Sequence, residues 1–148
     1  MVSHILVAVD GSTHGDRALA FASDLALKYE AEMTVLNVVS YASTVPLALG
    51  AYAELEGLYA ESRSVLQEAG DKIVANAAEQ ARRLGVENVT PVVELGSPAQ
   101  AICDTAEAIE ADVIVMGRRG LSDFTGFFLG SISHKVAHSA DCTVVTVK

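Results

Sequence analysis

The sequence predicts an α/β fold, in which a single domain forms an open five-stranded parallel sheet, in the order 3-2-1-4-5, with helices on both faces. Apolar segments rich in β-branched residues alternate with segments of helical spacing, and this alternation is typical of parallel sheets. Ile5–Val9 and Val113–Met116 are apolar throughout, as expected of central strands buried on both faces. Right-handed crossovers leave few strand orders, of which 3-2-1-4-5 is the natural choice. The predicted fold is therefore Rossmann-like.

Each predicted strand except the last is followed by a predicted helix. The strands span Ile5–Val9, Met33–Val39, Val89–Leu95, Asp112–Met116 and Thr143–Val147. The first helix runs from about His14 to Glu30, where small and apolar residues recur on one face. The fourth helix runs from Ser131 to Ser139.

The second helix carries an apolar seam from Val65 to Leu84. It can begin as early as Ala51, although Gly57 and Gly70 argue against one unbroken helix because glycine weakens helix interiors.

The third helix has a clear start signal. Ser97 is the expected N-cap, Pro98 occupies the first helical position, and Gln100 completes a capping box.

Composition limits the possible partners. The chain has 148 residues, enough for one domain over residues 1–148, and a formal net charge of −9. Such a charge repels nucleic acid and anionic lipid, and no apolar stretch approaches a membrane span, so we expect no nucleic acid and no membrane partner. The first residues lead directly into the first predicted strand and show no signal-peptide pattern. We therefore expect a cytoplasmic protein with reduced cysteines.

A glycine-punctuated segment follows the fourth strand. Gly117 and Gly120 enclose two arginines, and Gly130-Ser131 follows nine residues later, where the fourth helix begins. Glycine lets backbone N–H groups approach an anion, and a helix start adds unpaired donors and a positive dipole end. Taken singly, these residues are ordinary turn formers and an N-cap, but as a set they predict a phosphate site.

The predicted strand order brings a second segment to the same place. Asp10 ends the first strand and Gly117 follows the fourth, and both lie at the switch point of a 3-2-1-4-5 sheet. Asp10, followed by Gly11 and Ser12, can form a turn or cap for the first helix, since aspartate and serine both cap well, or it can contact a ribose or a metal-bound phosphate. This convergence predicts a ligand crevice.

The same segments resemble the nucleotide-binding signature of the universal stress protein family, in its ATP-binding branch. The resemblance covers the whole chain and rests on Ile5–Ser12, Gly96–Pro98, the glycine segment described above and Cys142–Val145. The sequence departs from the family pattern at Thr143, where proline is frequent, and at Arg119, where histidine is common. Thr143 leaves one more backbone donor free on the last strand.

The resemblance implies a bound adenine nucleotide, ATP, with Mg²⁺ or Mn²⁺ held through its phosphates. By this resemblance, we expect the glycines to cradle the phosphates, Ala8 and Val9 to flank adenine, and the backbone of Val38 to bond the adenine edge. Asp10 is the candidate metal ligand, and no catalytic residue is assigned. The candidate ligand-binding residues are Ala8, Val9, Asp10, Val38, Met116, Gly117, Arg119, Gly120, Gly130, Ser131, Ile132 and Ser133.

Three classes of function remain open from sequence. The first, which we favour, is a nucleotide-binding regulatory protein of the stress response that signals occupancy to a protein partner. The second is a slow ATP hydrolase, although the chain has no Walker loop and no evident base beside Gly130. The third is a dimeric interaction module with a vestigial pocket.

Three segments carry further expectations. Thr143–Val147 has no charge before Lys148, and such an edge strand favours a homodimer through antiparallel pairing. Ser40–Gly50 is unusually apolar for a loop and could cover a ligand, contact a partner or simply connect two elements. Leu121–Leu129 is expected to fold as a flap.

Overall fold

The computed structural model describes residues 1–40, 52–119 and 130–148, with side chains from residue 63 onwards in the second range. Its sheet has five strands, all parallel, in the order β3-β2-β1-β4-β5. The strands are β1 (His4–Ala8), β2 (Glu32–Val39), β3 (Val89–Leu95), β4 (Val113–Gly117) and β5 (Thr143–Val147). The predicted sheet order is confirmed.

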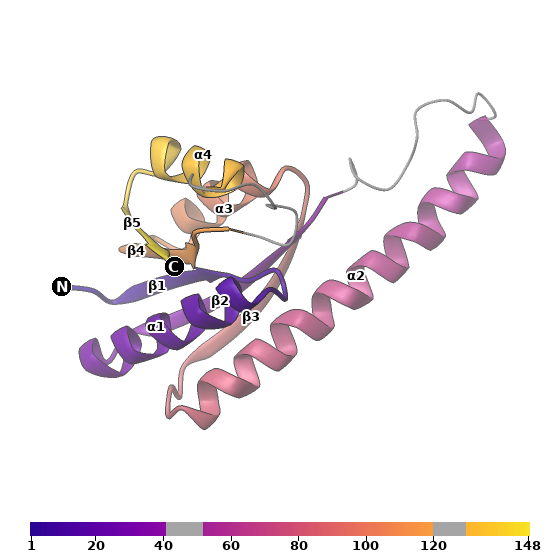
Figure 1. The fold of residues 1–148 in the computed structure, drawn as a ribbon. Helices are drawn as coiled ribbons and strands as arrows, with labels where there is room; N and C mark the ends of the chain where they lie inside the picture. Colours follow the sequence, from indigo (N-terminus) through magenta and orange to yellow (C-terminus); the bar gives the residue numbers. More distant parts are fainter. Residues whose placement is uncertain (41–51, 120–129) are drawn as a thin grey trace.

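Helices cover both faces of the sheet (Figure 1). They are α1 (Thr13–Tyr29), α2 (Tyr52–Arg83), α3 (Pro98–Ala108) and α4 (Ser131–Ser139). The helices α1 and α2 lie on one face, and α3 and α4 lie on the other. The α/β class is therefore also confirmed.

The core is divided into two layers by the alternation of side chains along each strand. On β1, Ile5 and Val7 point towards α1 and α2, whereas Leu6 points towards α3 and α4. These three side chains are completely buried. Because both faces are covered, a central strand needs apolar residues at every position, which explains the continuous apolar run in the sequence.

The helix α2 differs from the prediction, because it is one helix of 32 residues. The interruption expected at Gly57 and Gly70 is therefore wrong. At Gly70 the reason is packing: a Cβ atom there would lie 3.0 Å from side-chain atoms of Asn37, Val39 and Val93. Glycine allows the helix to approach the sheet closely, and tertiary packing outweighs its low helix propensity. The first part of α2 extends beyond the sheet (Figure 1).

The residues expected to cap two helices differ in whether their side chains make the capping hydrogen bond. Ser12 caps α1, accepting a hydrogen bond from the backbone N–H of Gly15 at 3.2 Å. Ser97 is the N-cap of α3 and Pro98 is its first residue, but within the described residues the Ser97 side chain makes no capping hydrogen bond. Gln100 instead donates to Asp104 at 2.6 Å, so the capping box is wrong although the helix start is right.

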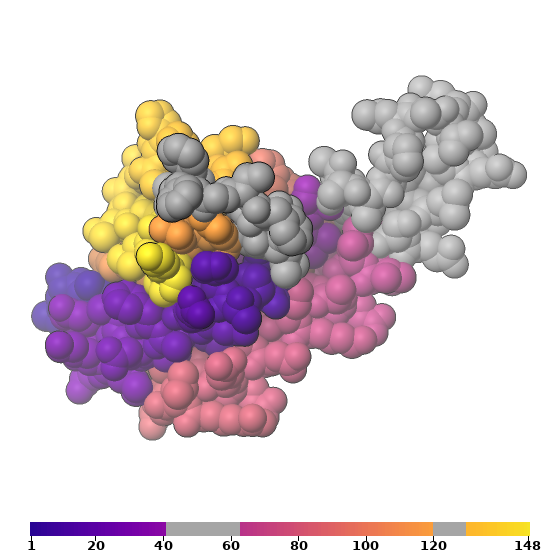
Figure 2. Space-filling model, in the orientation of Figure 1, coloured from indigo at the N-terminus to yellow at the C-terminus, as the bar shows by residue number. Residues whose placement is uncertain are grey.

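The C-terminal end of the chain lies against α1. Figure 2 shows the surface of α1 beside the C-terminal end of the chain. Arg17 Nη1 donates to the backbone carbonyl of Lys148 at 3.3 Å. Among the helices that the structure describes, none is long and apolar enough to cross a membrane.

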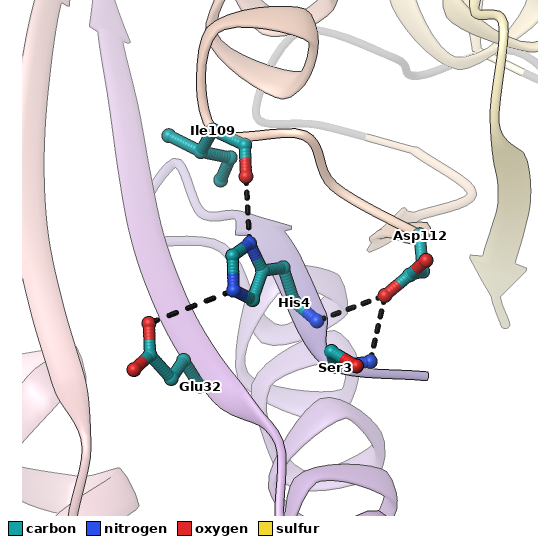
Figure 3. A network of polar contacts seen from close by, with 5 residues as sticks. All are labelled: Ser3, His4, Glu32, Ile109 and Asp112. Atoms are coloured by element: carbon teal, nitrogen blue, oxygen red, sulfur yellow. Dashed lines mark hydrogen bonds and ion pairs between the residues drawn. The ribbon is translucent and has the colours of Figure 1, made fainter. Parts of the chain in front are cut away.

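A polar network closes the edge of the sheet at which the strands begin (Figure 3). The Asp112 carboxylate accepts hydrogen bonds from the backbone N–H groups of Ser3, at 2.6 Å, and His4, at 3.0 Å. His4 Nδ1 lies 2.7 Å from the carbonyl oxygen of Ile109, and its Nε2 lies 3.8 Å from Glu32. The network ties the start of β1 to the segments before β4 and at the start of β2.

Thr143 belongs to the same edge. Its backbone N–H donates to the carbonyl of Asp112 at 3.3 Å. The donor that threonine adds at this position is therefore used within the chain, and the expectation that it is free for pairing is wrong.

Asp112 makes stability depend on pH. The hydrogen bonds from Ser3 and His4 favour the carboxylate and lower the pKa of Asp112. Its contribution is present above the unfolded pKa of about 3.9 and is lost as the pH falls through the lower folded pKa. We expect Asp112→Asn to lower the free energy of unfolding at pH 7, and the difference from wild type to shrink below about pH 4.

Urea unfolding of both proteins between pH 3 and pH 7 measures this difference. Asp24→Asn, at an exposed position of α1, corrects for the general loss of one negative charge. A difference that stays constant across this pH range would show that Asp112 does not act through its ionisation.

Candidate functional site

A cleft of about 440 Å³ lies at the edge of the sheet where the strands end. Its volume falls within the range of about 300–1,000 Å³ typical of small-molecule sites. The cleft is lined from β1, β2 and β4 and from all four helices or the turns before them. It therefore occupies the predicted switch point, where β1 separates β2 from β4.

The structure brings the predicted ligand-binding residues together around this cleft. Those that line it are Ala8, Val9, Asp10, Val38, Met116, Gly117, Arg119, Gly130, Ser131, Ile132 and Ser133. Gly120 lies outside the described residues, as do Leu121–Leu129 and most of Ser40–Gly50. Segments more than a hundred positions apart in the sequence thus meet in one place.

Asp10 belongs to the turn between β1 and α1. Its Oδ1 accepts hydrogen bonds from Ser12, at 3.0 Å from the backbone N–H and 2.5 Å from the hydroxyl. Gly15 follows closely in α1, and a Cβ atom there would lie 3.2 Å from Asp10 Oδ1. Asp10 thus orders the start of α1 while lining the cleft, so the structural role that the sequence allowed is observed.

The segment after β4 is held by backbone hydrogen bonds on both sides. The N–H of Arg118 donates to the carbonyl of Val147 at 2.7 Å, and the N–H of Gly130 donates to the carbonyl of Arg118 at 2.8 Å. The Ser133 hydroxyl adds a contact to the Arg118 carbonyl at 2.9 Å. These bonds fix the end of β4 against both β5 and the start of α4.

Gly117 is glycine for a steric reason that the sequence does not show. A Cβ atom at this position would lie 2.8 Å from Cβ and 2.9 Å from the backbone carbon of His14. Real Cβ atoms do not approach so closely, so any larger residue would push β4 and α1 apart. The glycine therefore permits close approach of two protein segments, whatever the ligand.

The helix α4 points its first turn into the cleft. Gly130 is the N-cap, and no side chain within the described residues caps the helix. The first backbone N–H groups of a helix have no intrahelical partner, and they carry the positive end of its dipole. Ser131 and Ile132 are exposed, so this end of the cleft presents hydrogen-bond donors suited to an anion.

The two arginines occupy different positions. Arg119 lines the cleft, whereas Arg118 is not among its lining residues. The Nε atoms of both are buried and have no hydrogen-bond partner in the described part of the chain. A guanidinium is a good partner for phosphate oxygens, so Arg119 is placed to add positive charge beside the α4 N-terminus.

Sequence reasoning missed several residues of the cleft. Asn37 lies on β2, is 6% exposed, and donates from Nδ2 to the carbonyl of Val9 at 2.8 Å. The signal was available, because Asn37 is a polar residue between the apolar residues Leu36 and Val38. The remaining missed residues come from neighbouring elements and carry no local signal: Gly15, Leu36, Val39, Ser40, Leu66, Ala69, Gly70, Ile73, Pro98 and Ile102.

The side chains do not form a metal cage on their own. Among the described residues there is no group of three or more histidine, cysteine, aspartate or glutamate side chains that could hold a metal ion. The half-buried Asp10 is the acidic residue of the cleft lining. A divalent cation would therefore need oxygen ligands from a bound phosphate as well.

The two serines of the first turn of α4 allow a matched test of local structure. Ser133 is 2% exposed and donates to the carbonyls of Arg118 and Gly130, the latter at 3.0 Å. We expect Ser133→Ala to destabilise the protein by about 1 kcal/mol, because the carbonyls of Arg118 and Gly130 each lose one of their two donors. Ser131 is exposed, and Ser131→Ala should change stability little.

Chemical denaturation of the two variants measures both effects. Equal effects on the free energy of unfolding would mean that the Ser133 hydrogen bonds do not hold the segment after β4.

Comparison with known proteins identifies the family. The family model described as "Universal stress protein family" matches residues 1–148. Universal stress protein YxiE of Bacillus subtilis is 36% identical, and the alignment covers all of both chains. A universal stress protein of Thermus aquaticus is also 36% identical over the whole of both chains.

Solved structures share the fold. The universal stress protein UspA from Lactobacillus plantarum superimposes with a TM-score of 0.86 at 23% identity, covering 99% of this chain and 98% of the other. A universal stress protein in complex with cAMP gives a TM-score of 0.70 at 24% identity, covering 99% and 97%. One from Archaeoglobus fulgidus in complex with dAMP gives 0.61 at 20% identity, covering 100% and 98%. The chain belongs to the universal stress protein family.

Proposed function

We propose that the cleft binds an adenine nucleotide, ATP in the first place, and that the chain is a regulatory protein of the ATP-binding branch of its family. The observation that carries this proposal is the division of the cleft into two chemically different ends. Val38, Val39 and Leu66, beside β2 and α2, give one end an apolar lining. The backbone N–H groups of Ser131 and Ile132 and the side chain of Arg119, beside α4 and β4, give the other end hydrogen-bond donors and positive charge. A nucleotide has the same division into an apolar base and an anionic phosphate chain.

The complexes of relatives support the choice of ligand. Two universal stress proteins of the same fold have been solved with cAMP and with dAMP, which are both adenine nucleotides. Fold similarity alone does not establish a ligand, so the proposal rests on the cleft of this chain.

Binding is a better account of the site than rapid catalysis. The sequence contains no Walker loop, and the described cleft lining contains one carboxylate, Asp10, whose Oδ1 already accepts two hydrogen bonds from Ser12. Slow hydrolysis remains the second candidate function, because a polar cleft can hold a triphosphate long enough for water to react. Turnover within the ordinary enzyme range of about 1–1,000 per second would contradict the regulatory proposal.

A divalent cation, Mg²⁺ or Mn²⁺, fits this proposal as part of the ligand. Bound through the phosphates, it would offset the repulsion between the triphosphate and the Asp10 carboxylate. Asp10 is the residue of the cleft that could contact it.

The binding proposal predicts thermal stabilisation. Ligand that binds only the folded state adds about 2.7 kcal/mol at one hundred times its dissociation constant. For a chain of this size we expect the melting temperature to rise by roughly 5–10 °C with ATP and Mg²⁺. Scanning fluorimetry with ATP, ADP, GTP and buffer measures the shift. Failure of every adenine nucleotide to shift the melting temperature, at millimolar concentration, would rule out the proposed ligand.

Substitutions at the anionic end test where the phosphates bind. Gly130→Val should abolish ATP binding, because a branched side chain would occupy the approach to the first turn of α4, while the fold is retained. Gly130 has φ −58° and ψ 154°, which valine also adopts, so backbone strain does not confound the result. Calorimetric titration measures affinity, and Lys135→Ala, on an exposed position of α4, is the control. Unchanged affinity in Gly130→Val would place the phosphates elsewhere.

We also propose that the protein is a homodimer paired through β5. This strand forms one edge of the sheet and is half-exposed over Val144–Val147. An edge strand offers unpaired backbone groups, and antiparallel pairing with a second copy closes a two-fold interface.

The dimer is tested by sedimentation. At micromolar concentration we expect a mass near twice 15.5 kDa. Thr146→Lys should shift the protein towards monomer because a charged side chain on an edge strand disfavours pairing with another chain, and Thr146→Ser should not. Thr146 suits this test better than Val145, which packs against the core of its own chain. A monomeric wild-type protein would contradict the proposal.

A further inference from the structure

A second groove, separate from the cleft, lies between β3 and α3. Its volume is about 520 Å³, and none of its lining residues lines the cleft. The helix α3 forms the wall between the two hollows. Pro98 and Ile102 line the cleft, whereas Ala101 and Asp104 line the groove.

The strand β3 forms the edge of the sheet opposite β5, and among the described residues it pairs with β2 alone (Figure 1). Residues of a parallel strand turn their backbone groups alternately towards one neighbour and the other. The carbonyl of Asn88 accepts from Met33, and the N–H of Gly96 donates to Val39, so these two positions face β2. The odd-numbered residues between them therefore turn their backbone groups outward: Val89, Pro91, Val93 and Leu95.

The first half of this outer edge is closed, and the second half is open. Arg82 Nη2 donates to the outward carbonyl of Val89 at 2.9 Å, and Pro91 has no N–H to offer. Val93 and Leu95 each turn a donor and an acceptor outward, with no strand beside them in the described part of the chain. Leu95 and its neighbour Glu94 line the groove, so the open half of the edge lies beside it.

The groove combines an apolar lining with negative charge. Val92 and Ala101 belong to the apolar part, and Glu94 and Asp104 carry exposed carboxylates. The described lining residues include no lysine, arginine or histidine. A long basic side chain suits such a surface, because its stem can lie on apolar atoms while its charged end reaches a carboxylate. The net charge of −9 adds attraction for a basic partner at longer range.

We propose that the groove and the open edge of β3 dock an extended, basic segment of a partner protein. The segment adds a strand to the sheet through Val93 and Leu95 and places lysine or arginine side chains beside Glu94 and Asp104. Backbone hydrogen bonds provide affinity in this mode of recognition, and the side chains in the groove provide selectivity. A second copy of the chain paired through β3 is disfavoured, because the carboxylates of both copies would meet.

This inference goes beyond the proposed function and does not rest on it, because the groove shares no lining residue with the cleft. It assigns the partner-binding surface of the protein to the side of α3 that faces away from the cleft.

The experiment titrates isotope-labelled protein with a defined peptide and follows the backbone amides by NMR. The probe is Lys-Val-Lys-Val-Lys-Val, blocked at both ends, which can place every lysine on one side of an extended strand. The first control peptide has the same sequence with every backbone amide N-methylated, so that it keeps the charge but cannot pair as a strand. The second control peptide has glutamate in place of each lysine.

We expect the lysine peptide to shift the amide signals of Val93, Leu95 and the groove side of α3, and neither control peptide to do so. Glu94→Gln and Asp104→Asn should each weaken binding about two- to fivefold, as expected for the loss of one exposed charge pair. Asparagine at position 104 keeps an acceptor for the hydrogen bond from Gln100. Asp24→Asn, which removes the same charge from α1 on the other face of the sheet, should bind as the wild type does.

Three results would each overturn the proposal. The first is the absence of shifts in β3 and α3 with the lysine peptide. The second is equal binding of the N-methylated peptide, which would leave only a general attraction between charges. The third is an affinity in Glu94→Gln and Asp104→Asn that does not differ from that of Asp24→Asn.

Discussion

The pairing of β1 with β4 is the constraint on which the site depends. The two strands are paired in parallel over Ile5–Ala8 and Val113–Met116 and are buried on both faces. Their register places the Asp10 turn beside the segment that starts at Gly117, although more than a hundred residues separate them. Because both strands end at the same edge, the start of α1 and the start of α4 converge on a single cleft.

Close approach of backbones, achieved at three glycines, shapes this cleft. Gly117 lets β4 lie against His14, Gly15 lets α1 lie against Asp10, and Gly70 lets α2 lie against β2 and β3. In each case a Cβ atom would meet protein atoms before it met any ligand. The glycines therefore set the distances between the elements that line the cleft. Their effect on a bound ligand follows from those distances.

Hydrogen bonds complete the arrangement at the anionic end. The Arg118 carbonyl accepts from Gly130 and from the Ser133 hydroxyl, and the Arg118 N–H donates to Val147. The start of α4 is thereby fixed relative to β4 and β5, which directs the unpaired N–H groups of its first turn towards the cleft. A rigidly held helix start can bind an anion without first being ordered, so less of the binding free energy is lost as entropy.

The sequence by itself determined the class of fold, the strand order and about half of the cleft lining. It could do so because buried parallel strands require continuous apolar runs, and because turn and helix-start residues such as Asp10, Ser12 and Gly130 carry local signals. The starts of α1 and α3 could be predicted because their turn and capping residues carry such local signals.

Only the tertiary structure decided what depends on packing between distant elements. In the structure α2 is one helix, in which Gly70 allows close packing on the sheet. The Ser97 side chain makes no capping hydrogen bond within the described residues, and the backbone N–H of Thr143 donates within the chain. The tertiary structure also brought Leu66 and Asn37 to the cleft. The physical reason is common to all of these: steric fit and hydrogen-bond partners are properties of two segments together, and neither segment alone carries a signal for them.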